Sequence, residues 1–253
     1  MCDATVMPRR TTARHQNFNK CEAHLLRNLP AMRVFITAAT VGEWMPCFSN
    51  IDKLYTEKSK RLKIYFHQSG VGMLTSCFSL TKLVMEEKPD MIIQVGMAGS
   101  YDATMPLGKV VVVDKEIDGN TGVEEDGKWR DLFNMKLEKP NYYPFEKKML
   151  PNTHIEKLNL LKLKTVTGVT VTEITTRKER IQQLMKKYEP TIETMEGAAL
   201  HYVCRQTNTS FLQMRTISNY VGERDKSKWM IKDALDNLNT TLIQYIDKLY
   251  KIA

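Results

Sequence analysis

Three polar side chains of this chain stand where a strand-like segment ends or a helix-like segment begins: Glu43, Glu196 and Asn219. A carboxylate can take a proton from water or accept hydrogen bonds from two neighbouring hydroxyls, and an amide can donate and accept at once. Because sheets covered by helices bind ligands beyond the carboxyl ends of their strands, these positions are candidates for a functional site. Taken alone, each carboxylate is explained equally well by a helix start, where the helix dipole stabilises an acid.

Two glycines follow the strand-like segment 91–95 and could bring the backbone close to a ligand. Gly96 and Gly99 have no Cβ, so the N–H groups there can approach a bound molecule closely. The same pattern is typical of a tight strand-to-loop turn that binds nothing. The segment lacks the GxGxxG pattern of dinucleotide-binding turns and the Walker pattern of phosphate-binding loops, which predicts that no nucleotide serves as a cofactor.

The elements that must position these residues alternate between strand and helix. Strands rich in β-branched and aromatic residues are expected at 33–39, 63–67, 91–95, 109–114, 164–171 and 211–218, and helices at 73–88, 177–188, from about 196 onward, and 229–250. Such alternation predicts an α/β fold: a single three-layer domain in which helices flank a central mixed β-sheet. The segment 118–160 is expected to be an excursion from that sheet.

The chain of 253 residues is expected to divide at Met32. Residues 1–31 have no periodic apolar positions and no apolar core of a secretion signal, so we expect a disordered tail or an extension of the gene model there. Residues 32–253 show no internal repeat and are expected to form one catalytic domain.

Composition excludes several classes of protein. The net charge is +8, of which +3 falls in residues 1–31, and the remaining +5 is spread over residues 32–253 without a concentrated basic face, so binding to nucleic acid is not predicted. No apolar run is long enough to cross a membrane, and the 5 cysteines show no paired spacing, which together predict a soluble protein of the reducing cytoplasm. The 5 histidines have no metal-ligand spacing, and no metal or other cofactor is predicted.

Considered together, these segments resemble the purine nucleoside phosphorylase and nucleosidase superfamily over nearly all of residues 32–253. The stretches that carry the resemblance are 32–43 (MRVFITAATVGE), 69–72 (SGVG), 95–99 (VGMAG), 107–111 (LGKVV), 193–199 (ETMEGAA) and 215–219 (RTISN). The family cleaves the N-glycosidic bond of purine ribosides through a ribosyl cation, with water or phosphate as the nucleophile. Within it, the stretch 211–224 together with Trp229 is most similar to the futalosine hydrolases.

The resemblance implies a role for each candidate residue. Glu43 would activate water and Glu196 would bind the ribose hydroxyls. The remaining substrate-binding positions that it implies are Met195 beneath the sugar, Ile174 against the base, and Ala98 and Gly99 in the glycine segment. In phosphorylases of the family an arginine on the strand at 92–96 helps to hold phosphate, and Gln94 at that place favours hydrolysis.

Asn219 departs from the aspartate of the adenine-specific nucleosidases. Its amide can donate to a 6-oxo group and accept from a protonated N7, which matches hypoxanthine and mismatches adenine. The futalosine hydrolase resemblance therefore implies release of hypoxanthine from futalosine, giving dehypoxanthine futalosine on a route to menaquinone. The carboxylate of that substrate requires a cation, for which Arg130, Arg224 and Lys228 are equal candidates.

Three alternatives remain open at this point. One is a nucleosidase that acts on methylthioadenosine, adenosylhomocysteine or aminofutalosine, and another is a phosphorolytic purine nucleoside phosphorylase. The third is a nucleoside-binding protein that has lost turnover. Relatives assemble with pocket residues from a neighbouring subunit, so the resemblance also implies a homo-oligomer.

Overall fold

The structure is a computed structural model that describes residues 31–55 and 61–252. Residues from Met32 onward form one unit, and only that unit is described. The tail expected at 1–31 lies outside the described residues except for Ala31.

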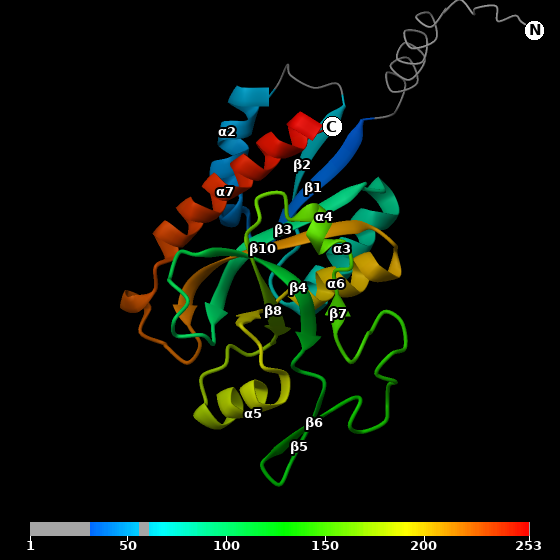
Figure 1. Cartoon of the computed structure of the whole chain (residues 1–253), viewed down its shortest axis with the longest axis vertical. Helices are drawn as coiled ribbons and strands as arrows, with labels where there is room; N and C mark the ends of the chain where they lie inside the picture. Colours follow the sequence, from blue (N-terminus) through cyan, green and yellow to red (C-terminus); the bar gives the residue numbers. More distant parts are fainter. Residues whose placement is uncertain (1–30, 56–60, 253) are drawn as a thin grey trace, which may run out of the picture. The chain divides into compact units, whose positions relative to one another are not determined.

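An 8-stranded mixed sheet forms the centre of the described part of the chain (Figure 1). Its strands are β1 (Met32–Ala38), β2 (Leu62–Gln68), β3 (Met91–Ser100), β4 (Val110–Asp118), β7 (Leu150–Pro151), β8 (Lys164–Thr170), β9 (Ile192–Thr194) and β10 (Ser210–Tyr220). β1 pairs with β2 and β3 in parallel, whereas β10 pairs with β4, and β3 with β9, in antiparallel fashion. β10 also pairs with β3, and β8 pairs with both β4 and β9. The pairings therefore close a ring of five strands in the order β3, β10, β4, β8 and β9.

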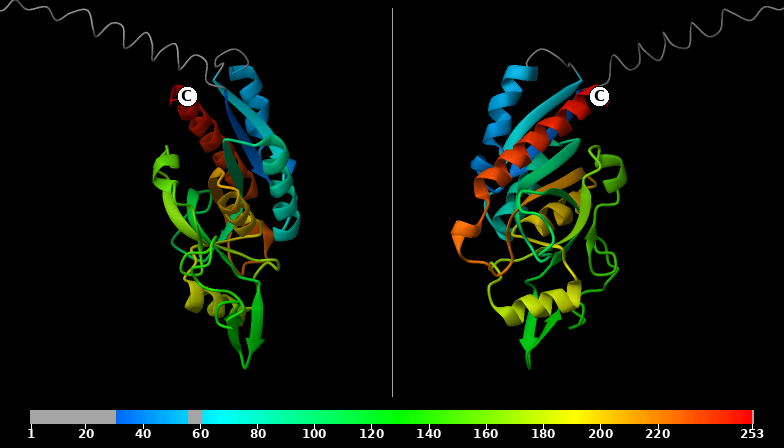
Figure 2. Two further views of the ribbon diagram at one scale, coloured as in Figure 1. Left: turned by 90° about the vertical axis from the view of Figure 1, so that its right-hand side faces the viewer. Right: turned by 60° about the vertical axis from the view of Figure 1, so that its left-hand side comes forward.

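Helices cover both faces of the sheet, as the views in Figure 2 show. α2 (Met45–Tyr55) and α7 (Ile231–Ile252) pack on one face, where Cys47, Leu242 and Tyr245 meet Val34 and Ile36 of β1. α3 (Met73–Glu87) and α6 (Gly197–Gln206) pack on the other face against residues that include Phe35 and Ile92. Alternate residues of β1 therefore enter different cores, as expected for a strand that is buried on both faces. The predicted three-layer α/β fold is confirmed.

The sequence pattern placed most elements but misjudged the glycine segment. β3 continues as strand through Gly96 and Gly99 to Ser100, so these glycines belong to the sheet and not to a turn. The reason is that β9 and β10 pair with this part of β3 and satisfy its backbone. The short strand β9 itself gave no recognisable pattern in the sequence.

Most of the segment 118–160 lies outside the sheet, as expected, but β7 returns to it and pairs with β4. The segment contains the hairpin of β5 (Gly122–Glu125) and β6 (Lys128–Asp131), the strand β7 and the helix α4 (Ile155–Leu158). The helix α5 (Lys178–Tyr188) packs beside the hairpin, because Lys187 bonds to Asp131 and the Arg180 guanidinium lies over the Trp129 ring.

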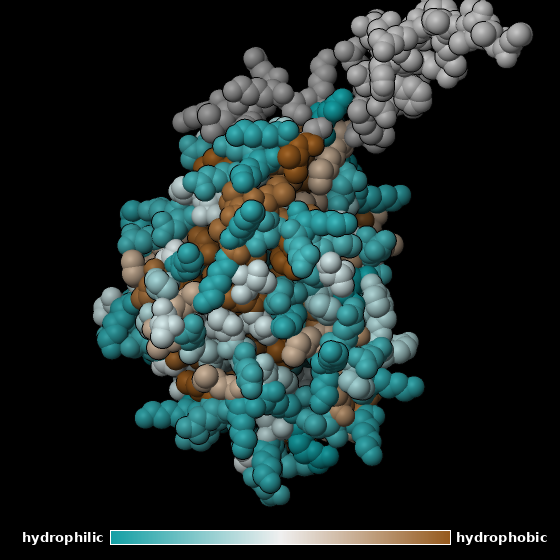
Figure 3. Space-filling view, viewed as in Figure 1, coloured by the Kyte–Doolittle hydropathy of each residue, from teal (hydrophilic) through white to brown (hydrophobic). Residues whose placement is uncertain are grey.

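Apolar side chains on α3 face away from the sheet. Leu74, Phe78 and Met85 are 86%, 72% and 68% exposed, although they contribute to the apolar pattern that predicted this helix. Leu80 and Leu83 make the contact with the core instead. On the face of the molecule that Figure 3 displays, the surface is mainly hydrophilic, with a narrow hydrophobic band beside α7. Within the described ranges, no helix combines the length and apolar character that a membrane span requires.

Candidate active site

A pocket of about 260 Å³ opens at the ends of β1, β3, β9 and β10. It is lined by Ala39, Thr40, Glu43, Val71, Met97, Ala98, Gly99, Ile174, Glu193, Thr194, Met195, Glu196, Arg215, Ser218, Asn219 and Trp229. The seven residues that the sequence analysis assigned to the site, namely Glu43, Ala98, Gly99, Ile174, Met195, Glu196 and Asn219, all belong to this wall. Segments far apart in the sequence therefore converge as the pattern of strand ends predicted.

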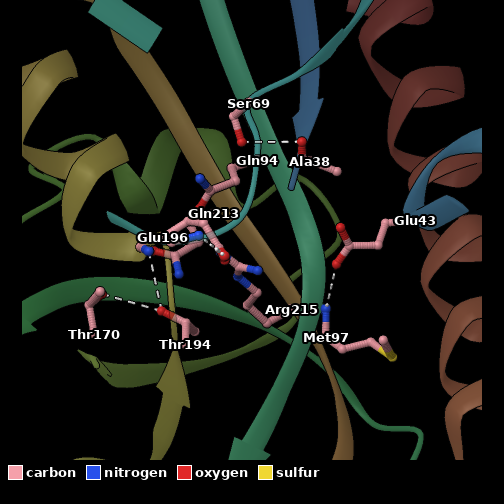
Figure 4. A network of polar contacts seen from close by, with 12 residues as sticks. Ala38, Glu43, Ser69, Gln94, Met97, Thr170, Thr194, Glu196, Gln213 and Arg215 are labelled. Carbon is pink, nitrogen blue, oxygen red and sulfur yellow. Dashed lines mark hydrogen bonds and ion pairs between the residues drawn. The ribbon is translucent and has the colours of Figure 1, made fainter. Parts of the chain in front are cut away.

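Glu43 ends a short 3₁₀ helix, η1 (Val41–Glu43), directly after β1, and its side chain is buried and held in place. Its Oε2 accepts hydrogen bonds from the backbone N–H of Thr40 at 2.9 Å and from the Thr40 hydroxyl at 3.2 Å. Its Oε1 faces β3, where the N–H of Met97 lies 3.4 Å away (Figure 4). The Glu43 carboxylate thus accepts hydrogen bonds at the start of η1, as expected of an acid at a helix start, and it also lines the pocket.

Glu196 is the N-cap of α6 and is 5% exposed. Its Oε1 accepts a hydrogen bond from the N–H of Gly72 at 3.0 Å, and its Oε2 lies 3.6 Å from a guanidinium nitrogen of Arg215. Gly72 has a φ of 86°, a conformation that glycine adopts without strain. The SGVG segment therefore anchors this carboxylate from outside the sheet.

Arg215 is the one cationic side chain among the described residues that line the pocket, and it was not among the predicted site residues. It is 1% exposed, and its Nη2 donates to Gln94 Oε1 at 2.7 Å as well as facing Glu196. Its side chain crosses Gly96, because a Cβ built on Gly96 would collide with Arg215 Nη1. The neighbouring strand β10 thus places a guanidinium beside Gln94, a contact that the sequence analysis did not predict.

Asn219 lies near the end of β10, and both the oxygen and the nitrogen of its side-chain amide form hydrogen bonds within the protein. Its Oδ1 accepts from the Ser218 hydroxyl at 2.8 Å, and its Nδ2 donates to the carbonyl of Tyr220 at 3.1 Å. An amide offers two hydrogens and two lone pairs, so one of each remains for a ligand.

A buried polar cluster supports the first turn of α6 from below. Glu116 is fully buried and accepts hydrogen bonds from Gln213 at 2.8 Å, Thr170 at 3.0 Å and Thr194 at 3.3 Å. The same two threonine hydroxyls accept the N–H groups of Ala198 and Gly197, the first residues of α6. Burial raises the pKa of Glu116 to about 7. Glu116 is thus linked to the N-cap Glu196 through the two threonine hydroxyls at the start of α6, and Arg215, which faces Glu196, also acts electrostatically on Glu116.

Sequence reasoning missed Arg215, Glu193 and Glu116 as parts of the site or its support. One signal was available for Arg215, because Gln213 and Arg215 interrupt an otherwise apolar strand at a spacing of two and so share a face. Glu193 begins the stretch 193–199 that carried the resemblance, but the sequence analysis assigned it no role. Glu116 followed a strand that was expected to end at residue 114.

The pocket wall carries three carboxylates and one guanidinium, so its formal charge is negative. Within residues 31–55 and 61–252, no group of three or more His, Cys, Asp or Glu side chains is arranged to hold a metal ion. His201 packs in the core, where burial lowers its pKa to about 4.

The chain belongs to the Phosphorylase superfamily, which it matches over residues 35–251. It is 26% identical over 174 residues to the futalosine hydrolase of Thermus thermophilus, covering 68% of this chain and 76% of that protein. It is 22% identical over 197 residues to the 5′-methylthioadenosine/S-adenosylhomocysteine nucleosidase of Psychromonas ingrahamii, covering 70% of this chain and 82% of that protein.

Solved structures show the same fold. The native futalosine hydrolase of Helicobacter pylori superposes with a TM-score of 0.69 at 16% identity, covering 86% of this chain and 98% of that one. A Helicobacter pylori nucleosidase mutant with 5′-methylthioadenosine in its active site gives a TM-score of 0.70 at 16% identity, covering 86% and 99%. The resemblance stated from the sequence is confirmed, and so is the expectation of an N-glycosidic hydrolase.

Proposed function

We propose that this protein hydrolyses the N-glycosidic bond of futalosine, releasing hypoxanthine and dehypoxanthine futalosine for menaquinone biosynthesis. The observation that carries the proposal is that Glu43, Glu196 and Asn219 line one pocket. These residues supply a base for water, acceptors for a sugar diol and an amide for a 6-oxopurine. The similarity to the Thermus thermophilus futalosine hydrolase supports the choice of nucleoside.

Hydrolysis is favoured over phosphorolysis by the charge of the pocket. Glu43 and Glu196 are buried in the wall, and a phosphate anion placed beside them would be repelled. The one cation of the described wall, Arg215, is already shared between Glu196 and Gln94. A developing ribosyl cation, in contrast, is stabilised by the same carboxylates.

In the proposed reaction Glu43 activates water and Glu196 binds the sugar. Glu43 accepts a proton from water as the water oxygen bonds to C1′ of the ribose. N7 takes a proton from the solvent, the C1′–N9 bond breaks with its electron pair passing to the purine, and hypoxanthine leaves as the neutral base. Glu43 then returns the proton from the attacking water to the solvent, so no net proton is consumed. Glu196 holds the 2′- and 3′-hydroxyls, which fixes the sugar while positive charge grows at C1′.

Asn219 supports a 6-oxopurine as the leaving base. Its free N–H can donate to O6, and the free lone pair of its carbonyl can accept from protonated N7. The 6-amino group of adenine would instead place a donor against a donor, so the methylthioadenosine-type alternative is less well supported.

Arg224 is the best supported of the three cations considered for the substrate carboxylate. Its guanidinium lies 5.6 Å from the centre of the Trp229 ring, and Trp229 lines the pocket. Lys228 pairs with Glu223, and Arg130 pairs with Glu125 of the β5–β6 hairpin.

The proposal includes a homo-oligomer that works in the cytoplasm. Support for self-association comes from the exposed apolar residues Leu74, Phe78 and Met85 of α3, because the exposed Val71 just before this helix also lines the pocket. Sedimentation of the wild type and of Phe78→Glu tests this, since a charge among these residues should dissociate the oligomer. Support for the compartment comes from the described cysteines, Cys47, Cys77 and Cys204, which are all free.

The test is chromatography of the base that the purified protein releases from futalosine, aminofutalosine, methylthioadenosine and inosine, each with and without phosphate. We expect hypoxanthine from futalosine at a rate that phosphate does not change. Preferential release of adenine would assign the protein to the aminopurine nucleosidases. Cleavage that requires phosphate would make it a phosphorylase, and binding without any cleavage would favour a nucleoside-binding protein.

A further inference from the structure

A second cavity lies beside the loop that joins β8 to α5, and the proposed reaction does not use it. Its volume is about 190 Å³, and its wall is formed by Asn120, Val171, Glu173, Thr175, Thr176, Arg177 and Arg180. It shares no lining residue with the pocket of the candidate active site. Within the loop, Ile174 lines the active-site pocket, whereas its neighbours Glu173 and Thr175 line the second cavity. The loop therefore separates the two.

Two guanidinium groups without an acidic partner belong to the wall of the second cavity. Among residues 31–55 and 61–252, neither Arg177 nor Arg180 forms an ion pair with a carboxylate. Arg180 is only partly exposed, and its guanidinium lies 4.1 Å from the centre of the Trp129 ring. It donates to the carbonyl of Gly119 and to Gln183 Oε1, both of which are uncharged. Because charges that are withdrawn from water are normally paired, this arrangement indicates a missing anion.

The two guanidinium groups act on each other across the cavity. Burial lowers the pKa of Arg180, and the charge of Arg177 lowers the same pKa further. Glu173 is the one acid among the described residues of the wall, and it is exposed. Two arginines and one glutamate leave the wall with one net positive charge. An anion held between the guanidinium groups would offset their repulsion and accept hydrogen bonds from both.

We propose that this cavity binds a dianionic phosphoryl group, of free phosphate or of a phosphate ester, between Arg177 and Arg180. The planar fork of a guanidinium matches the spacing of two phosphate oxygens, and the Thr176 hydroxyl in the wall is a further donor. The cavity of about 190 Å³ has room for about six waters at the liquid volume of water, which is enough for the five non-hydrogen atoms of phosphate.

This inference goes beyond the proposed function and is independent of it. A phosphoryl group in the second cavity would lie outside the pocket that Glu43 and Glu196 line, with Ile174 between the two. It could not serve as a nucleophile at C1′ of a nucleoside in that pocket. Binding of phosphate and hydrolysis that does not require phosphate are therefore expected in the same protein.

Calorimetric titration of the full chain with sodium phosphate tests the inference. At about pH 8, where phosphate carries close to two negative charges, and at constant ionic strength, we expect saturable binding with a Kd below about 10 mM. Arg177→Gln should weaken binding at least about tenfold, as for the loss of a charge-assisted hydrogen bond. Arg177 is exposed, so this variant is expected to fold.

Lys186→Gln is the matched control. It removes the same charge from an exposed position near the other end of α5 and should leave the Kd unchanged. Absence of saturable binding to the wild type would overturn the inference. Equal affinity of the wild type and Arg177→Gln would place the phosphate elsewhere and would overturn it as well.

Tryptophan fluorescence locates the bound anion, because Arg180 lies over the Trp129 ring. Phosphate should change the emission of the wild type, and Trp129→Phe should lose this change while calorimetry still detects binding. A change that persists in Trp129→Phe would place the anion beside another tryptophan and contradict the proposed site.

Titration with glycerol 3-phosphate distinguishes the two sources of the phosphoryl group. Tighter binding of the ester would assign the site to phosphate esters, whereas tighter binding of phosphate would assign it to the free anion. Acetate, a monoanion, should bind at least about tenfold more weakly than either, and equal affinity for acetate would overturn the assignment of a phosphoryl group. None of these measurements depends on cleavage, so a failure to hydrolyse nucleosides would refute the proposed function alone.

Discussion

Glu43 of η1 and Arg215 of β10 both reach the space that a side chain at Gly96 would occupy. A Cβ at Gly96 would lie 2.8 Å from Glu43 Oε1 and would collide with Arg215 Nη1. Gly96 pairs directly with Arg215 across the sheet, so the missing side chain makes room for a carboxylate and a guanidinium together. Figure 4 shows both side chains beside β3, and we propose that Glu43 activates water there.

Gly96→Ala should displace these two groups and lower activity. We expect a loss in kcat of about 100-fold, because a misplacement of about 1 Å at a reacting group has an effect of that size. The measurement is steady-state kinetics on futalosine. Gly42→Ala is the control, since a Cβ there meets nothing within 4 Å, and it should behave as the wild type. Wild-type activity in Gly96→Ala would show that the two groups need not meet.

Glu43→Gln should abolish the proposed base while keeping the shape of the side chain. General-base catalysis contributes about 10²–10⁴-fold, and we expect kcat to fall within that range. Binding of hypoxanthine, measured by calorimetry, should stay within about threefold of the wild type, because the proposed base contact is at Asn219. A variant that turns over normally would exclude Glu43 as the base.

Asn219→Asp should shift the preference from 6-oxopurines toward 6-aminopurines. A protonated carboxyl group can donate to N7 of adenine, whereas the carboxylate loses the N–H that the amide offers to O6. Competition between futalosine and aminofutalosine in one reaction, followed by chromatography of the released bases, measures the shift directly. An unchanged ratio of hypoxanthine to adenine would contradict the proposed recognition of the base by Asn219.

Arg215→Met should destabilise the fold because it leaves Glu196 buried without its cation. Removal of one partner of a buried ion pair typically costs about 3–5 kcal/mol, and we expect a loss of unfolding free energy in that range by urea denaturation. The double variant Arg215→Met with Glu196→Gln should recover part of the loss. Equal stabilities of the single and double variants would mean that the two side chains are not coupled.

The buried Glu116 should make stability fall as pH rises. Its pKa in the fold is about 7 against an ordinary value of 4.5, so the folded chain holds a proton that the unfolded chain releases between these values. The contribution is complete below about pH 4.5 and is lost as pH rises through 7, by about 3 kcal/mol in total. Glu116→Gln, which cannot ionise, should flatten the dependence of unfolding free energy on pH from 5 to 8. A slope equal to that of the wild type would show that Glu116 does not titrate in this range.

The sequence was sufficient to predict the α/β fold and the convergence of the strand ends. Glu43 and Asn219 could be found because each stands next to a clear apolar strand, and the fold rules then bring strand ends together. Arg215 was overlooked because a strand pattern says which residues alternate but not that a long side chain will cross the glycine of the neighbouring strand. Glu193 was overlooked because its place in the pocket wall depends on the pairing of β9 with β3, and no local pattern encodes pairing between strands so distant in the chain.

The surroundings of Glu116 place a joint constraint on how this sequence can diverge. A Cβ at Gly168 or Gly197 would collide with the Glu116 carboxyl group, and both glycines have ordinary φ values. Neither glycine is therefore required by the backbone: Gly168 is required by the acid, and Gly197 by the acid together with the Gln213 amide nitrogen, which would lie 2.6 Å from that Cβ. Relatives that carry a larger residue in place of Gly168 should have a shorter side chain in place of Glu116, and those that carry one in place of Gly197 should differ at Gln213 as well, so these sites are expected to change together during evolution.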